Sequence, residues 1–158
     1  MITPEEWQQY KDFVGFNDQD IEALGWVAEP SEFFVGEVIE YLYSFLTSSP
    51  MTRDYFTDQA LLEHVKQAQT RYFLQLFQSD YDEQYLQSRI DVGIAHKKIG
   101  LPFTVYLATY SHYFMFIRPH IFEYIDDEDA AFKVMDAIAK LITLDEMVTS
   151  TAFTDYQV

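Results

Sequence analysis

VGIAHKKIGLP, residues 92–102, is the most informative stretch of this chain. It places His96 near the end of a predicted helix, which a glycine and a proline then terminate within one turn. Val92 and Ile99 lie four residues before and three residues after His96, so the imidazole falls on the apolar face. A neutral imidazole on such a face suits a metal, haem iron included. The alternative is a core histidine bonded to a carbonyl, and periodicity alone leaves both open.

The composition indicates one acidic domain spanning residues 1–158. Hydrophobic residues make up 49% of the chain and aromatic residues 18%, which is too apolar for a disordered segment. The formal net charge is −16 and the pI is near 4.3. A field of this sign repels phosphate backbones and anionic lipids, so we expect neither a nucleic-acid partner nor a membrane partner.

The chain has no cysteine, which excludes disulfides, thiolate metal sites and covalent haem attachment. Any haem is therefore expected to be held non-covalently. The N-terminus is acidic and lacks the basic start and apolar stretch of a signal peptide, and no apolar run approaches a spanning helix. We expect a cytoplasmic protein.

Apolar residues recur at helical spacing, and no strand-like alternation is sustained, so the predicted fold is all-α. Thr3 and Glu6 predict a capping box for the first helix, and Pro119 predicts a kink or early fraying late in the sixth. The predicted helices run from Pro4 to about Val14, from after Asn17 to about Glu29, from after Ser31 to Ser48, from after Thr57 through Phe77, from about Tyr81 to Lys98, from Pro102 to about Tyr124, and from after Asp126 or Asp127 to about Tyr156.

The segment around His96 resembles the proximal region of globin-coupled sensors. The matching residues in this chain are Arg89-Ile90, His96, Ile99-Gly100-Leu101-Pro102 and, in the next helix, Tyr106. Two further family motifs follow the same order: Tyr43, Leu46, Ser48 and Pro50 match the third-helix signature, and Val65-Lys66-Gln67-Ala68-Gln69 match the start of the distal helix. The resemblance covers nearly the whole chain and implies a globin fold with an extra N-terminal helix.

The resemblance also implies roles for individual residues. It makes His96 the proximal ligand of haem b iron, and Tyr43 the distal residue that hydrogen-bonds bound O2. Val65 and Ala68 would line the distal pocket, and Tyr106 would hydrogen-bond or steady the imidazole. From the residues themselves, Gly93 is expected to clear space for a flat ligand beside His96.

Two positions depart from the family pattern. Val65 stands where the family often has Leu, and Ala68 stands where some members carry Thr, so Tyr43 is expected to be the only distal donor. Tyr41 and His64 are expected to point away from the pocket, because they are rotated by about 200° and 100° from pocket positions on their helices. His112 and His120 are expected to serve packing or an interface.

Five basic residues fall on the two helices that would sandwich a porphyrin, where haem propionates favour cations. Ordinary solvated charges are the alternative for these residues, which are Lys66, Arg71, Arg89, Lys97 and Lys98.

These patterns predict a haem-binding sensor of O2, and also of CO and NO, that is not an enzyme. The family implies a homodimer through the last two helices, for which the sequence offers Tyr110, Tyr113, Phe114, Phe116 and Ile117, although core packing also explains them. It further implies a C-terminal output domain; residues 1–158 are expected to hold the sensor domain alone, as part of a longer protein. A non-haem globin-fold interaction module and a stand-alone O2-binding globin remain as alternatives. An enzymatic globin is disfavoured, because no acid–base pair or distal histidine suits O–O cleavage.

Overall fold

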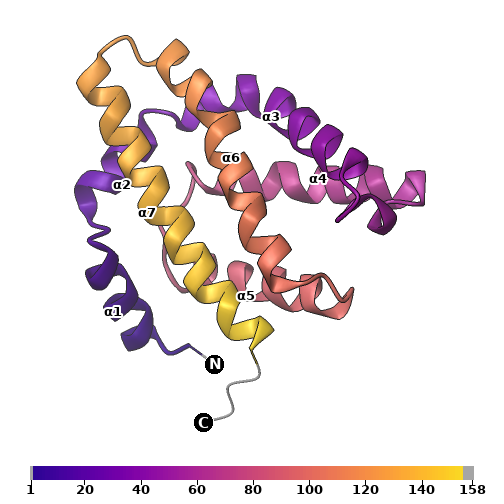
Figure 1. The fold of residues 1–158 in the computed structure, drawn as a ribbon. Coiled ribbons are helices and arrows are strands. Elements are labelled where there is room, and N and C mark those ends of the chain that lie inside the picture. The colour runs from indigo at the N-terminus through magenta and orange to yellow at the C-terminus, as the bar shows by residue number, and fades with distance from the viewer. Residues whose placement is uncertain (1, 155–158) are drawn as a thin grey trace.

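The computed structural model describes residues 2–154, and this part of the chain is helical, without a strand (Figure 1). The predicted end of the last helix, near Tyr156, lies outside the described residues. The helices are α1 (Pro4–Val14), α2 (Asp18–Gly25), α3 (Ala28–Ser48), the short 3-10 helix η1 (Arg53–Tyr55), α4 (Gln59–Gln75), α5 (Glu83–Lys98), α6 (Phe103–Tyr124) and α7 (Glu128–Phe153).

Polar side chains cap most helix N-termini by accepting from exposed backbone N–H groups. The predicted capping box at α1 is confirmed: Thr3 accepts from the Glu6 N–H at 3.2 Å, and Glu6 accepts from the Thr3 N–H at 2.7 Å. Asp127 caps α7, which is one of the two residues predicted for that place. The predicted cap Thr57 is wrong, because the neighbouring Asp58 carboxylate accepts from the Ala60 N–H at 3.0 Å.

The boundary between α2 and α3 differs from the prediction. Helix α2 ends at Gly25, and α3 begins at Ala28 rather than after Ser31. Pro30 therefore lies in the first turn of α3, where its missing N–H costs no hydrogen bond. Ser31 is fully buried and donates to the Ala28 carbonyl at 2.7 Å, so it is a core residue and not a cap.

Helix α6 continues through Pro119 to Tyr124, so the expected early fraying does not occur. The residues that follow the proline are held by packing: Ile121 is fully buried, and the His120 ring stacks on Phe34 with centroids 4.8 Å apart. Tertiary contacts therefore keep the last turns helical.

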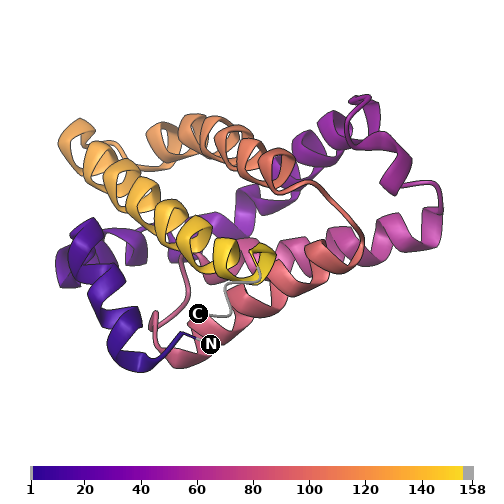
Figure 2. The same ribbon diagram turned by 60° about the horizontal axis from the view of Figure 1, so that its bottom comes forward.

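Helix α7 is the central element of the fold. It packs against α5, α6, α2 and α1, with α1 and α2 on one side and α3 and α4 on the other (Figure 1). Figure 2 shows α7 lying across α5. Its buried face is mostly aliphatic and includes Val134, Ile138, Leu141 and Val148, with the polar residue Asp145 among them. Burying such side chains is the main stabilising contribution to the fold.

Gly93 lets α5 and α7 approach closely. A Cβ added at this position would lie 2.8 Å from the Ala152 Cβ and 3.3 Å from backbone atoms of Thr149. Helix packing therefore explains this glycine, and the prediction that it clears space for a flat ligand is corrected: its open side faces α7.

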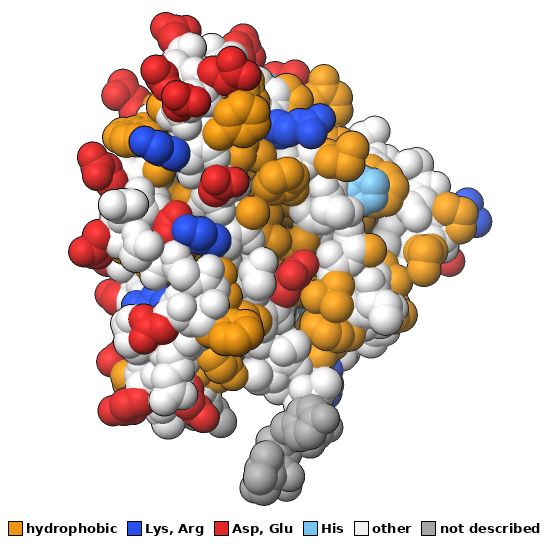
Figure 3. Space-filling view, turned by 60° about the vertical axis from the view of Figure 1, so that its left-hand side comes forward, with side chains coloured by type: hydrophobic (Ala, Val, Ile, Leu, Met, Phe, Trp, Pro, Cys, Tyr) orange, Lys and Arg blue, Asp and Glu red, His pale blue; other side chains and the backbone are white. Residues whose placement is uncertain are grey.

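Acidic side chains are spread over the face shown in Figure 3, with few basic ones between them and hydrophobic groups in patches. This distribution agrees with the net charge of −16. None of the helices in the described residues 2–154 is long and apolar enough to cross a membrane.

Candidate functional site

His96 lies in the last turn of α5 and is partly buried. Its Nδ1 lies 2.8 Å from the Val92 carbonyl oxygen, one turn earlier. Since a carbonyl oxygen only accepts, Nδ1 carries the proton and Nε2 keeps its lone pair. Burial lowers the pKa of His96 below its usual 6.5, and the bond to Val92 opposes this shift only in part. The residue is therefore a neutral imidazole whose Nε2 is available to a metal.

Tyr106 packs directly against this imidazole. The two ring centroids lie 4.8 Å apart, with an angle of 59° between the ring planes. The Tyr106 hydroxyl, however, is paired with the Tyr110 hydroxyl at 2.9 Å. Of the two predicted roles, the structure therefore favours a ring that steadies His96 over a hydroxyl that bonds it.

Tyr43 is buried on α3, with 5% of its surface exposed. Its ring packs edge-on against Phe56, and its hydroxyl lies 3.5 Å from the Val65 carbonyl of α4. This distance is at the limit of a hydrogen bond, so the hydroxyl is only weakly engaged. Burial raises the pKa of Tyr43 to about 12, which keeps the phenol protonated and able to donate.

Val65 and Ala68 lie three residues apart on α4 and share a face of that helix. Both are half-buried. The neighbouring Gln69, which belongs to the same motif, donates its amide to the Tyr113 hydroxyl of α6. That bond uses the Gln69 amide, whereas the Tyr43 hydroxyl lies 3.5 Å from the Val65 carbonyl oxygen.

Tyr41 and His64, which are predicted to point away from the pocket, lie at the surface. Tyr41 is 52% exposed and donates to Glu37 at 3.2 Å, while His64 is exposed. His112 packs on the Phe45 ring, and His120 stacks on Phe34. The packing role expected for the last two histidines is confirmed.

Two of the five basic residues that were expected near the haem propionates have other surroundings. Arg89 is completely buried between the rings of Tyr72 and Tyr85. It therefore lies in the core and not at the surface, where it could pair with a haem propionate. Lys66 is paired with Glu40 at 3.0 Å, which supports the alternative of ordinary charges beside acids.

The described contacts bring the predicted residues together in two groups. Tyr43 meets Val65 between α3 and α4, and His96 meets Tyr106 between α5 and α6. Helix α4 packs chiefly on α3, and α5 packs chiefly on α7, so these two helices are not joined by extensive packing of their own. The donor set of one neutral imidazole and one weakly bonded phenol fits a haem, because the porphyrin itself supplies four ligands to the iron.

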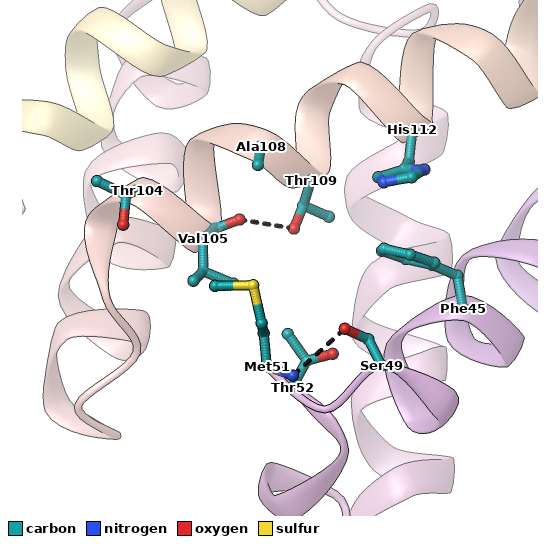
Figure 4. A pocket seen from close by; sticks show the side chains of 9 residues that line it. All are labelled: Phe45, Ser49, Met51, Thr52, Thr104, Val105, Ala108, Thr109 and His112. Atoms are coloured by element: carbon teal, nitrogen blue, oxygen red, sulfur yellow. Dashed lines mark hydrogen bonds between the residues drawn. The ribbon is translucent and has the colours of Figure 1, made fainter.

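A separate small pocket of about 160 Å³ lies between α3 and α6 (Figure 4). The predicted ligand residues do not line it. The figure shows the His112 imidazole over the Phe45 ring and the Met51 side chain close to Val105. His96 is not among the residues that line this pocket.

Sequence reasoning missed a cluster of buried polar residues next to the site. Its centre is the fully buried pair of Arg89 on α5 and Asp145 on α7. The only local signal was a charged residue inside an apolar helix face: Asp145 follows Leu141 and Leu144 and precedes Val148. Such a position predicts a buried charge but does not identify its partners.

Comparison with known proteins agrees with this architecture. Residues 3–157 match the model of the protoglobin family. The globin domain of the Geobacter sulfurreducens globin-coupled sensor aligns with a TM-score of 0.87 and 22% sequence identity, over 94% of this chain and 97% of that domain. The ferric and ferrous forms of the globin domain of E. coli DosC align with TM-scores of 0.78 and 0.77, at 17% and 16% identity, over 92% of this chain and 98% of theirs. No curated protein sequence matches the chain. The chain therefore belongs to the protoglobin family and has the all-α globin fold of sensor-globin domains, with the additional N-terminal helix α1.

Proposed function

We propose that this chain is a gas-sensing domain that binds haem b non-covalently between α4 and α5, with His96 as the protein ligand to the iron. The observation that carries the proposal is the 2.8 Å contact between His96 Nδ1 and the Val92 carbonyl oxygen, which leaves Nε2 as the ring nitrogen with the lone pair; burial favours this neutral form by lowering the pKa of His96. Membership of the protoglobin family and the globin fold support it. The bond to Val92 fixes the tautomer and the orientation of the ring, as a metal-binding histidine requires.

Haem, when bound, supplies the iron that binds a diatomic gas such as O2, CO or NO. The residues of the chain would hold and select that ligand. Tyr43 would donate a hydrogen bond to polarised O2, since its phenol is protonated and has only a 3.5 Å contact to give up. Val65 and Ala68 would form the apolar wall on the same side, which admits gas and limits water.

Signalling is the second part of the proposal, and it acts through the last two helices of a homodimer. Tyr110, Tyr113 and Ile117, offered above as interface residues, are buried within the single chain. Met115, Phe122 and Phe132 are exposed instead, and the last two rings contact each other across α6 and α7 at 5.2 Å. These exposed groups are the better candidates for contact with a second copy, and a ligand would signal by changing how the copies pack.

Haem titration tests the proposal. The purified chain is expected to take up one haem and develop a Soret band, and His96→Ala is expected to lose or shift that band. His120→Ala is a matched control, because it removes a buried histidine that stacks on Phe34 and is distant in sequence from the site. A folded chain that shows only the absorption spectrum of free haem after haem addition would favour the alternative of a non-haem interaction module. We propose a sensor and not an enzyme, in keeping with the sensor domains whose fold it shares.

A further inference from the structure

A buried polar network lies behind His96 and is not used by the proposed function. Asp145 on α7 is completely buried and accepts two phenol hydrogen bonds, from Tyr85 at 2.7 Å and from Tyr72 at 2.9 Å. Arg89 on α5 is also completely buried, with its Nε 3.5 Å from the carboxylate. One carboxylate on α7 therefore meets side chains from α4 and α5.

The network continues from Asp145 to the imidazole. The Tyr72 hydroxyl lies 2.8 Å from the Tyr110 hydroxyl, which lies 2.9 Å from the Tyr106 hydroxyl. The Tyr106 ring in turn packs on His96, 4.8 Å away between centroids. Three hydrogen bonds and one ring contact thus lead from α7 through α4 and α6 to α5.

The direction of these hydrogen bonds follows from proton counting. Each phenol has one proton to donate, and Tyr72 gives its proton to the Asp145 carboxylate. Tyr110 must therefore donate to Tyr72, and Tyr106 must donate to Tyr110. The Tyr106 hydroxyl is consequently committed away from His96, and the carboxylate sets the direction of the whole chain.

Arg89 holds the far end of the network in place. Its guanidinium carbon lies 3.8 Å from the centroid of the Tyr72 ring and 4.1 Å from that of the Tyr85 ring. None of its three nitrogens makes a hydrogen bond of ordinary geometry within the described residues, so the carboxylate, the nearby Tyr85 hydroxyl and the two aromatic faces stabilise its charge. If either ring or the carboxylate moved, the buried cation would lose a group that stabilises its charge, which costs free energy. The Tyr72 ring, and with it the Tyr72 hydroxyl, is therefore held in place.

We propose that Asp145 is a positioning residue for His96: through Tyr72 and Tyr110 it fixes the Tyr106 ring against the imidazole, and so links the position of α7 to the haem-ligating side chain. The proposal rests on the proposed function for its consequence, since a shift of the imidazole matters only if His96 binds iron. The geometric claim about the two rings is independent of haem.

Tyr110→Phe and Tyr85→Phe test the proposal as a matched pair. Each removes one hydroxyl from a buried tyrosine of the same cluster, but only Tyr110 lies between Asp145 and Tyr106. In the haem-free protein, the NMR cross-peaks between the Tyr106 and His96 rings are expected to weaken or disappear in Tyr110→Phe and to persist in Tyr85→Phe. Equal spectra in the two variants would overturn the proposal, because a merely structural role makes no distinction between them.

The haem-loaded protein gives the second readout. Haem transfer to an excess of apomyoglobin is expected to be about 10-fold faster or more for Tyr110→Phe, and within about 2-fold of wild type for Tyr85→Phe. Asp145→Asn is expected to follow Tyr110→Phe, because the two tyrosines bond to different carboxylate oxygens and an amide replaces one of these acceptors by an NH2 group that only donates. If the wild type binds no haem, the proposed function fails, and the NMR comparison still decides the positioning claim.

Discussion

Replacing Tyr43 by Phe separates two effects of its buried hydroxyl: the effect on the stability of the protein and the hydrogen bond that it donates to a bound ligand. Within the described residues, the one hydrogen-bond contact of the hydroxyl is to the Val65 carbonyl at 3.5 Å, and Tyr43 is 5% exposed. An O–H···O bond is optimal near 2.7–2.8 Å, so this contact contributes little. The Phe ring keeps the packing on Phe56, and the free energy of unfolding is expected to change by less than about 0.5 kcal/mol.

The hydroxyl becomes useful only when a polar ligand replaces that carbonyl. A new hydrogen bond to O2 contributes about 0.5–1.5 kcal/mol, which corresponds to a roughly 2- to 10-fold change in affinity. We therefore expect Tyr43→Phe to release O2 roughly 2- to 10-fold faster, as measured by stopped-flow mixing of the ferrous O2 form with CO. CO binding is expected to change little, because bound CO is less polar.

Tyr41→Phe is the matched control, since it removes a phenol hydroxyl two residues away on the same helix. That hydroxyl bonds Glu37 and the side chain is 52% exposed, so no change in O2 release is expected. The reasoning would be refuted if Tyr43→Phe left O2 release unchanged, or if Tyr41→Phe changed it by the same factor.

Three further predictions concern stability, each measured by urea denaturation of the haem-free protein. Asp145→Asn leaves the Arg89 cation buried without its counter-charge and is expected to lower the free energy of unfolding by about 3–5 kcal/mol. Adding Arg89→Met to this variant should restore part of the lost free energy. A double variant no more stable than Asp145→Asn would contradict the pairing of the two charges. Gly93→Ala is expected to lower the free energy of unfolding by about 1–3 kcal/mol, because the added methyl group overpacks α5 against α7. Gly36→Ala is the control: its Cβ meets open space, and it should stabilise the protein by up to about 1 kcal/mol. A Gly93→Ala variant more stable than the wild type would exclude the close approach of α5 and α7. Burial lowers the pKa of His96 in the folded state, so the contribution of the neutral imidazole to stability is present above pH 6.5 and is lost as the pH falls below 6.5 towards the lowered pKa. His96→Gln should therefore lose less unfolding free energy than the wild type between pH 7 and 5. Identical pH profiles of stability for the two proteins would contradict a buried neutral imidazole.

The local parts of this account could be predicted from sequence because their signals are local. The helix that carries His96 is specified by the apolar spacing before it and by Gly100 after it, whose φ of 74° is the left-handed conformation that terminates a helix. Tyr43 was identified through its position in a short motif on one helix. In both cases the deciding residues lie within a few turns of one another.

The features that were missed depend on contacts between distant segments. The sequence pattern predicts a helix end before Pro30, but a proline in the first turn of a helix and a proline beyond a helix end have similar local patterns. Position 93 requires a glycine because Thr149 and Ala152 of α7, which come 56 and 59 residues later in the chain, pack against it. The network around Asp145 unites residues separated by 60 and 73 positions, which no local periodicity encodes.

The iron–histidine stretching band of the ferrous, ligand-free protein tests the central claim most directly. Resonance Raman spectroscopy is expected to show this band in the wild-type chain. The band should be absent in His96→Gly and should return when free imidazole is added, because the small molecule then occupies the space of the missing side chain. A wild-type chain without the band, or a band that survives in His96→Gly before imidazole is added, would contradict the assignment of His96 as the iron ligand.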